Sequence, residues 1–567
     1  MRILILQLTR MGDVLQTSPL TRELRRLHPD AHITMMVRSM GRGVAERNPF
    51  IDAILVYDEA VMYADLQSGD SERLHKAYQT AERYAGQIRD GAFDLIINCT
   101  HSIGSAMLLA LSGVKHVVGA HLSEDWQLVL RGPWVNYFFT SVFDRHYNDL
   151  NLCDIVRSFG GEAVAPSSLA LRVDAADRDV AREVMREAGI DSPSFLVAMQ
   201  LGASQDNKRW PVSHFAALAR ALKQRYNATI VLVGVKEEQR FGDEFESMAP
   251  GLATRLFGKT SIPQLAAILE QARVLVTNDT GTMHVAAAMK CPVVLVSVGF
   301  VHFRETGPYG EGHLAVERRR EHVGAALIDP GAQDLYTAIS PELVEQVVVY
   351  SVGEERESAI DVGSPLWSHA DVYRSAFAPD GCLEWYPLLR RPVDERAVLL
   401  IAYRSMWLHV LRETYDAARE GESVCAMLAC FDCGDVAAIV PVIDAAREAF
   451  AGLCALSQRG VVESESLVSA LERRAIDEAR QLVASLVRLD ESIRVYGEVH
   501  LATKSLVLIA RYERENLEGE NPMGLAQTTL GIYRGLGERA GRMMEKLDCI
   551  RGMLGAARNR VGAGLRW

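Results

Sequence analysis

The stretch Val274–Met289, VLVTNDTGTMHVAAAM, contains residue types that could hold an anion. Val274–Thr277 predicts a strand, Asn278–Gly281 breaks it with a polar turn, and the small residues that follow predict a helix. Backbone N–H groups without helical partners and the helix dipole attract negative charge at such a turn. An ordinary strand–helix connection capped by Thr or Asp has the same pattern. The turn alone therefore leaves both interpretations open.

A second polar loop follows the predicted strand Phe195–Gln200. It contains Ser204 and Lys208, which together with backbone N–H groups could contact a phosphate. A solvated loop lysine is the simpler interpretation. Because the carboxyl ends of parallel strands meet at one edge of a sheet, however, this loop and Asp279–Gly281 could reach one diphosphate.

Asp13 is the candidate for acid–base chemistry. It follows Gly12 directly after the apolar strand Arg2–Leu8. A carboxylate at this position could cap the following helix. It could equally take a proton from a substrate hydroxyl. Its position alone does not separate these two roles.

The elements that must place these residues alternate between strand and helix. Apolar runs predict strands, and 3.6-residue periods predict helices between them, which is the pattern of an α/β layered protein. The predicted strands are Arg2–Leu8, His32–Val37, Ala53–Tyr57, Asp94–Cys99, His116–Gly119, Phe195–Gln200, Thr229–Gly234, a short strand at Leu256 and Phe257, Val274–Thr277 and Pro292–Val298.

The ordered motifs resemble glycosyltransferase family 9, the ADP-heptose:lipopolysaccharide heptosyltransferases, over residues 1–348. The motifs are Met11-Gly12-Asp13, Gly202-Ala203-Ser204 with Lys208-x-Trp210-Pro211, Gly234 with Glu237 and Glu238, and Asp279-Thr280-Gly281-x-x-His284. The resemblance implies an α/β protein of GT-B fold, in which two doubly wound Rossmann-like domains face a cleft. We expect an acceptor-binding domain over 1–170 and a donor-binding domain over 171–350.

The resemblance also implies a role for each motif residue. Asp13 would be the general base, with Arg10, Met11 and Gly12 beside it on the acceptor side. Lys208 would act on the diphosphate. The expected donor-binding residues are Gly202, Ser204, Glu237, Asp279, Thr280, Gly281 and His284. A structural role for His284 stands beside this one, because a buried histidine commonly hydrogen-bonds its neighbours.

The implied reaction is an inverting sugar transfer from a nucleotide-diphosphate donor, typically ADP-heptose, to an acceptor hydroxyl. Such a displacement needs a base on one face of the sugar and a stabilised diphosphate on the other. A cation and a helix terminus can neutralise the departing ADP, so we expect no metal and no cofactor. The acceptor would be lipopolysaccharide core, another glycan or a protein.

Two other functions are open from the sequence. The chain could be a non-catalytic nucleotide-sugar-binding or scaffold protein whose helical part mediates protein interactions. It could also be a sugar-nucleotide epimerase on a similar fold, which requires an acid–base pair where only Asp13 is a good candidate.

The last third of the chain lies outside the resemblance. We interpret residues 351–394 as an irregular linker and 395–567 as an α-helical domain for oligomerisation or partner binding. The expected helices are Ala397–Ala418, Asp435–Phe450, Ser464–Leu489, Leu501–Asn516 and Gly524–Leu554. The spacing of Cys425, Cys430 and Cys433 resembles that of iron–sulfur ligands. Because these cysteines lie in an apolar segment, buried thiols are the preferred interpretation.

Length and composition limit the remaining functions. At 567 residues the chain can form several domains, and a net charge of −12 argues against phosphate-based nucleic-acid binding. No apolar run is long enough for a transmembrane helix, and the N-terminus reads as a strand rather than a signal peptide. We therefore expect a cytoplasmic protein, with peripheral contact to the cytoplasmic face of the inner membrane and homo-oligomerisation through the C-terminal helices as open possibilities.

Overall fold

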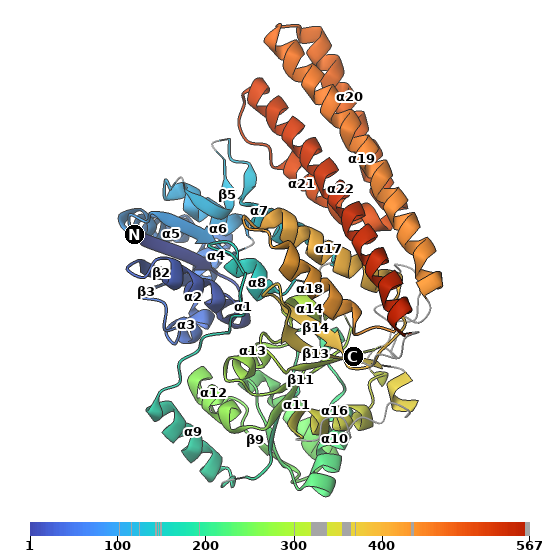
Figure 1. Cartoon of the computed structure of the whole chain (residues 1–567). Helices are drawn as coiled ribbons and strands as arrows, with labels where there is room; N and C mark the ends of the chain where they lie inside the picture. Colours follow the sequence, from blue (N-terminus) through green and yellow to red (C-terminus); the bar gives the residue numbers. More distant parts are fainter. Residues whose placement is uncertain are drawn as a thin grey trace. The chain divides into compact units, whose positions relative to one another are not determined.

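The computed structural model describes the chain with the exception of His101, Lys115, Glu124, residues 142–143, His146, residues 148–149, Ser192, Phe300, residues 319–336 and 354–364, His369, and residues 433–435 and 562–567. Strands and helices alternate up to α16, and helices alone follow after β14 (Figure 1). By its contacts the described chain forms two compact units. Unit 1 contains Met1–Leu6, Glu59–Asp149 and Arg390–Trp567, and unit 2 contains Gln7–Asp58 and Leu150–Leu389. The domain boundaries that we expect from the sequence stay a prediction.

The first sheet has six strands in the order β3-β2-β1-β4-β5-β6. The pairs β1–β4, β2–β3 and β4–β5 are parallel, and β6 returns antiparallel to β5. The strands are β1 Arg2–Gln7, β2 His32–Val37, β3 Ala53–Val56, β4 Leu95–Asn98, β5 Val117–Leu122 and β6 Leu128–Arg131. The helices that accompany them are α1 Met11–Gln16, α2 Ser18–Leu27, α3 Ser39–Ala45, α4 Glu59–Gln67, α5 Ser71–Asp90, α6 Ile103–Leu111, α7 Pro133–Ser141 and α8 Leu152–Arg157. The next helix, α9 Ala175–Glu187, packs on α12 (Ile262–Gln271) of the second sheet.

The second sheet has eight strands in the order β14-β13-β12-β11-β10-β7-β8-β9. The six strands from β7 to β12 are parallel to their neighbours, whereas β13 and β14 are antiparallel. The strands are β7 Leu196–Gln200, β8 Thr229–Leu232, β9 Ala253–Arg255, β10 Val274–Thr277, β11 Val293–Ser297, β12 Leu314–Arg318, β13 Ala370–Phe377 and β14 Leu383–Pro387. The helices and 3-10 turns are η1 Asp206–Lys208, α10 Val212–Tyr226, η2 Lys236–Glu238, α11 Gln239–Met248, α12 Ile262–Gln271, α13 Gly281–Ala288, α14 Phe303–Thr306, α16 Pro341–Val352 and η4 Pro365–Ser368.

Two of the expected elements in this region are wrong. The short strand is β9, which ends before Leu256 and Phe257. The stretch 351–394 is not irregular throughout, because β13 and β14 extend the second sheet from within it. Polar residues interrupt the apolar pattern of both strands, so neither has the continuous run of a buried parallel strand.

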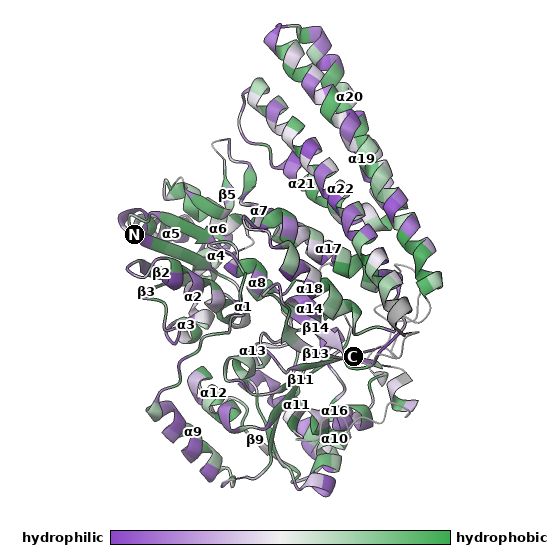
Figure 2. Cartoon of the chain, viewed as in Figure 1, coloured by the Kyte–Doolittle hydropathy of each residue, from purple (hydrophilic) through white to green (hydrophobic). Residues whose placement is uncertain are grey.

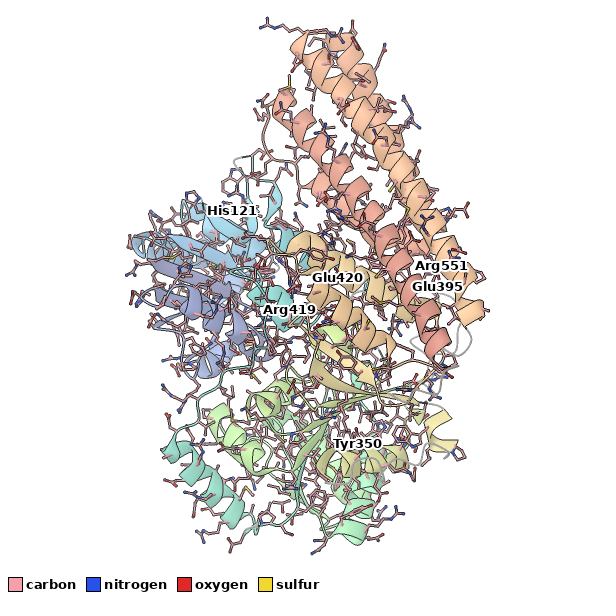
Figure 3. The ribbon with its side chains drawn as sticks, viewed as in Figure 1. His121, Tyr350, Glu395, Arg419, Glu420 and Arg551 are labelled. Atoms are coloured by element: carbon pink, nitrogen blue, oxygen red, sulfur yellow. The ribbon has the colours of Figure 1, made fainter. Side chains whose placement is uncertain are left out.

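The C-terminal region is helical, as expected. Its elements are α17 Glu395–Leu411, α18 Ala417–Leu428, α19 Val436–Glu472, α20 Ile476–Val499, η5 Leu501–Thr503, α21 Lys504–Glu515 and α22 Pro522–Val561. Ion pairs join these helices within unit 1. Lys546 of α22 pairs with Glu420 of α18, and Arg551 of α22 pairs with Asp444 of α19. Figure 3 labels Glu420 and Arg551.

Two of the expected helices are broken. The span Ala397–Ala418 contains the end of α17 and the start of α18, where Asp416 caps the new helix by accepting from the Ala418 and Arg419 N–H groups. The span Ser464–Leu489 contains a turn at Arg474, whose φ of +58° lies in the left-handed region. The hydrophobic period continues across both breaks, which is why periodicity alone misses them. None of the described helices combines the length and apolar character needed to cross a membrane.

Candidate active site

The loop after β7 is fixed at both of its ends. The Trp210 side chain is fully buried, and its Nε1–H donates to the Ile339 carbonyl at 2.9 Å. Asn278, which follows β10, donates through Nδ2 to the carbonyls of Leu201 and Gly202, both at 3.0 Å, and its Oδ1 accepts the Trp210 N–H at 2.9 Å. Since β7 and β10 are parallel neighbours, their strand ends deliver the two predicted loops to one place.

Lys208 reaches the β10 loop directly. Its Nζ lies 3.4 Å from Asp279 Oδ2, and both side chains are largely buried. The next residue, Thr280, is the N-cap of α13, but its side chain accepts no hydrogen bond from the first turn of the helix. A cation therefore lies beside a helix terminus that no described side chain caps, which is the arrangement that favours a bound anion.

The turn between β1 and α1 packs against the same helix, within unit 2. A Cβ added to Gly281 would lie 2.7 Å from Met11 Cε, and a Cβ added to Gly12 would lie 3.1 Å from His284 Cδ2. A Cβ at Gly12 would require the His284 ring to shift by a few tenths of an ångström, and a Cβ at Gly281 would require the end of the Met11 side chain to move. Met11-Gly12-Asp13 and Gly281-x-x-His284 therefore contact each other through two positions where only a glycine fits without displacement.

Asp13 is half-buried in the first turn of α1. Its Oδ2 accepts the Arg10 backbone N–H at 3.1 Å, so the carboxylate does cap the turn as one of the two interpretations requires. The described residues give Oδ1 no hydrogen bond. One carboxylate oxygen is thus held by the backbone while the other remains able to accept a proton.

His284 lies between two carboxylates and carries no salt bridge among the described residues. Burial lowers its pKa, and the negative charges of Asp279 and Asp13 oppose that shift. Its buried Nδ1 has no hydrogen-bond partner in the described structure. His284 is therefore a buried imidazole in contact with the α1 turn, and its Nδ1 makes no hydrogen bond to the described residues.

The β8 loop carries two acidic residues, Glu237 and Glu238, whose surroundings differ. Glu237 is exposed on η2, whereas Glu238 accepts from Gln200 Nε2 at 2.8 and 2.9 Å and from the Val235 N–H at 3.1 Å. A Cβ on Gly202 would lie 1.7 Å from Glu238 Oε1, so the carboxylate lies directly against the β7 loop. Burial raises the pKa of Glu238.

Two of the remaining expected site residues take no part in these contacts through their side chains. Ser204 and Arg10 are both exposed, and the structure shows no side-chain hydrogen bond for Ser204. In contrast, Gly202 is buried. Sequence reasoning named Glu238 as part of a motif but gave no role to Asn278 or Gln200, although a polar residue at the end of a buried parallel strand is the signal that could have found both.

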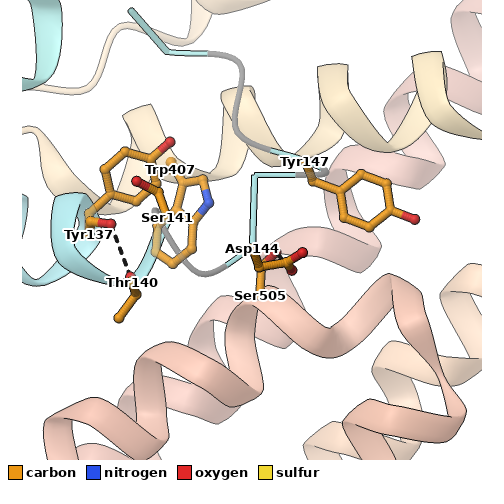
Figure 4. Close-up of a pocket in the computed structure, with 7 residues that line it drawn as sticks. All are labelled: Tyr137, Thr140, Ser141, Asp144, Tyr147, Trp407 and Ser505. Carbon is orange, nitrogen blue, oxygen red and sulfur yellow. Dashed lines mark hydrogen bonds between the residues drawn. The ribbon is translucent and has the colours of Figure 1, made fainter. Parts of the chain in front are cut away.

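A small cavity in unit 1 is not a second candidate. It lies among α7, α17 and α21, where Ser505 Oγ donates to Asp144 Oδ2 at 2.6 Å and Tyr137 contacts Trp407 (Figure 4). Its volume of about 10 Å³ holds about one water molecule. The aromatic residues of α7 are therefore packing residues, and Trp407 packs the helical region on α7.

The cysteines of the helical region are more accessible than expected. Cys425 is exposed and Cys430 is half-buried, so the expectation of buried thiols is wrong for Cys425, while Cys433 lies outside the described residues. Cys425 is exposed because α18 turns this position away from its buried face, which contains Val424 and Met427. In the described part of the chain, no three His, Cys, Asp or Glu side chains form a metal-binding group.

Comparison with known proteins agrees with the resemblance of the motifs. The sequence model of glycosyltransferase family 9 (heptosyltransferase) matches residues 82–322. Residues 82–322 match a glycosyltransferase family 9 domain. The matched span includes the Lys208 and Asp279 loops and begins after Asp13. The protein is accordingly a glycosyltransferase.

Curated relatives cover about half of this chain. Lipopolysaccharide heptosyltransferase 2 of Salmonella typhimurium is 23% identical over 309 residues, which are 52% of this chain and 82% of the relative. Lipopolysaccharide heptosyltransferase 1 of Escherichia coli is 23% identical over 328 residues, 57% of this chain and 95% of the relative. The crystal structure of the glycosyl transferase family 9 from Veillonella parvula is 22% identical with a TM-score of 0.51, covering 62% of this chain and 97% of that one. The expected GT-B fold with an appended helical region is confirmed.

Proposed function

We propose that the chain transfers a sugar, with inversion, from a nucleotide-diphosphate donor to an acceptor hydroxyl, and that Asp13 is the general base. The observation that carries the proposal is the contact between the Met11-Gly12-Asp13 turn and the Gly281-x-x-His284 turn within unit 2. This contact brings a carboxylate with a free oxygen close to a helix terminus and a lysine that suit a diphosphate.

In the proposed step, the acceptor hydroxyl gives its proton to Asp13 Oδ1 as its oxygen bonds to the anomeric carbon. The bond between that carbon and the diphosphate oxygen breaks, and the diphosphate leaves with the electron pair. Lys208 and the N–H groups at the start of α13 offset the developing charge. Because Asp279 already pairs with Lys208, the donor must compete for this cation, and Asp279 keeps the lysine in place before the donor binds.

The remaining expected residues follow from this placement of the diphosphate. Gly202, Ser204, Thr280 and Gly281 border the Lys208–Asp279 pair in sequence, and we assign them to the diphosphate and the sugar. We assign the acidic side of the nucleoside site to the Glu237-Glu238 pair, with Glu238 as the side chain that lies against Gly202. His284 separates the base from the diphosphate loop as a neutral group.

We propose ADP-heptose as the donor, since the relatives are heptosyltransferases by name. The proposed acceptor is a hydroxyl of lipopolysaccharide core or of a glycoprotein. Both are consistent with a protein that works on the cytoplasmic face of the inner membrane. We assign no cofactor to the reaction.

The test is a comparison of Asp13→Asn with the wild type. ADP release from ADP-heptose is measured with heptose-free lipopolysaccharide as acceptor, and ADP binding is measured by calorimetry. Asp13→Asn keeps the hydrogen bond from Arg10 but cannot accept a proton, so we expect kcat to fall by roughly 10²–10⁴ with ADP affinity unchanged. Asp30→Asn, an exposed carboxylate in the same unit, is the control and should retain full activity.

Retention of wild-type turnover by Asp13→Asn would rule out Asp13 as the base. A wild type that binds ADP tightly but turns over neither this acceptor nor water would favour the alternative, a non-catalytic nucleotide-sugar-binding protein. A matched pair tests the diphosphate site. Lys208→Met should weaken ADP binding, whereas the exposed Lys223→Met on α10 should not.

A further inference from the structure

Helix α20 exposes apolar side chains that no described residue of the chain covers. Its buried face contains Leu486, Leu489 and Ile493 and packs on α19 and α21. Five aliphatic side chains elsewhere on the helix are between 43% and 69% exposed, namely Ile476, Val483, Val487, Val495 and Val499. Figure 2 shows hydrophobic and hydrophilic segments alternating along α20. Single exposed aliphatics are common, so we infer an interaction surface only from Ile476, Val487 and Val495, which share one face of the helix with side chains of both charges.

We propose that α20 pairs antiparallel with α20 of a second copy of this chain, around a twofold axis that passes between Ser485 and Leu486. A helix of 24 residues is about 36 Å long, which is enough for a stable antiparallel contact. Residues at equal distances from the axis then face one another across the two copies. Ile476 faces Val495, and Ala484 faces Val487.

The charges of the same face identify the second copy as the partner. Under this axis Arg480 of one copy faces Glu491 of the other, and Asp477 faces Arg494. Each pair has opposite signs, and each occurs twice because the interface is self-complementary. Viewed along the helix axis, the paired residues between Ile476 and Val495 lie within about 100° of one another, because the helix has 3.6 residues per turn. They therefore share one face. An unrelated partner would not require this symmetry of charge.

The present environment of these charges supports the pairing. Asp477 and Arg480 have no ion-pair partner among the described residues, so each is available to a second copy. Arg494 already contacts Glu491, at 2.6 Å, and Glu498. In the dimer Arg494 would keep these neighbours and gain Asp477 of the other copy, forming a network in place of an isolated surface pair.

The experiment is a charge swap in the full-length chain, read by sedimentation velocity without donor or acceptor. We expect the wild type to be a dimer at micromolar concentrations. Arg480→Glu and Glu491→Arg each place like charges opposite one another at two symmetric points and should raise the dimer Kd at least about tenfold. The double variant Arg480→Glu/Glu491→Arg restores opposite signs and should regain most of the wild-type affinity.

Lys76→Glu, a reversal of an exposed charge on α5, is the matched control and should leave the Kd unchanged. Circular dichroism of each variant checks that the helices remain folded. A monomeric wild type, or a dimer that the single reversals do not weaken, would overturn the proposal. So would failure of the double variant to recover, because the rescue depends on Arg480 facing Glu491. None of these results depends on the proposed transferase reaction.

Discussion

The Trp210 backbone N–H donates to Asn278 Oδ1 at 2.9 Å, across 68 residues of sequence. The same side chain donates to the carbonyls of Leu201 and Gly202. One fully buried amide therefore satisfies three backbone groups of the β7 loop, which contains Lys208. The position of the cation in the candidate site depends on a residue that we do not expect to touch the donor.

Replacing Asn278 should disturb the loop and the fold together. Asn278→Ala leaves an N–H and two carbonyls buried without partners, at a cost of about 1–3 kcal/mol each before relaxation. We expect a lower free energy of unfolding in urea and weaker ADP binding by calorimetry. Asn278→Asp keeps the acceptor for Trp210 but places a carboxylate oxygen against the Leu201 and Gly202 carbonyls, so it should weaken ADP binding at least as much as Asn278→Ala. Equal ADP affinity in all three proteins would show that the loop holds its conformation without this side chain.

A buried ionic cluster should make Asp154 important for stability. Asp154 Oδ1 accepts from Tyr309 Oη at 2.7 Å and lies 3.3 Å from Arg157, and Oδ2 accepts the Leu383 N–H at 2.8 Å. Asp154→Ala strands a buried guanidinium, so we expect a loss of about 3–5 kcal/mol in the free energy of unfolding. Denaturant titration measures it. The exposed Asp179→Asn should lie within about 0.5 kcal/mol of the wild type.

Much of the sheet architecture could be predicted because buried parallel strands are continuous apolar runs. His32–Val37 and Val274–Thr277 form strands with the expected bounds. The antiparallel strands β13 and β14 were missed because polar residues such as Arg374 and Glu384 interrupt their pattern. The end of α19 could not be found either, since it depends on Arg474 in a left-handed conformation that arginine rarely adopts.

The part of the candidate site that could be predicted from the sequence is the part that the geometry of parallel strands determines. That geometry brings Lys208 and Asp279 together, since both follow neighbouring parallel strands. The sequence does not show which of Glu237 and Glu238 lies against the β7 loop. The backbone conformation after Val235 decides this, because it turns only the Glu238 carboxylate toward Gly202. The contact between Gly12 and His284 joins residues 272 positions apart, and no local pattern in the sequence determines it.

The stability of the fold should fall in acid because of His313. Burial lowers the pKa of this histidine from 6.5 to about 4. The unfolded chain therefore binds a proton between these pH values that the folded chain excludes, and stability falls as the pH falls through this window. Over that pH range the free energy of unfolding of the wild type should fall by up to about 3 kcal/mol more than that of His313→Gln. Thermal unfolding of the wild type and His313→Gln from pH 7 to pH 4 measures this difference in stability. His75→Gln, at an exposed histidine, is the control, and its stability should change with pH as that of the wild type does.

Gly12 should be intolerant of a methyl group because of what it contacts. A Cβ there would lie 3.1 Å from His284 Cδ2 and 3.6 Å from Gly281 Cα, so Gly12→Ala must displace the His284 ring or the start of α1 by a few tenths of an ångström. We expect kcat/KM for ADP-heptose to fall about tenfold, since small misplacements of a catalytic group are costly. Gly86→Ala on α5, where a Cβ meets nothing within 4 Å, is the control and should stabilise the helix by about 0.5–1 kcal/mol without changing kcat/KM.

In a His284→Ala background the obstructing ring is absent, so Gly12→Ala should have a smaller effect there. The coupling energy of the double-mutant cycle measures the contact between the two residues. Additive effects of the two substitutions would mean that Gly12 and His284 do not act on each other in the working enzyme.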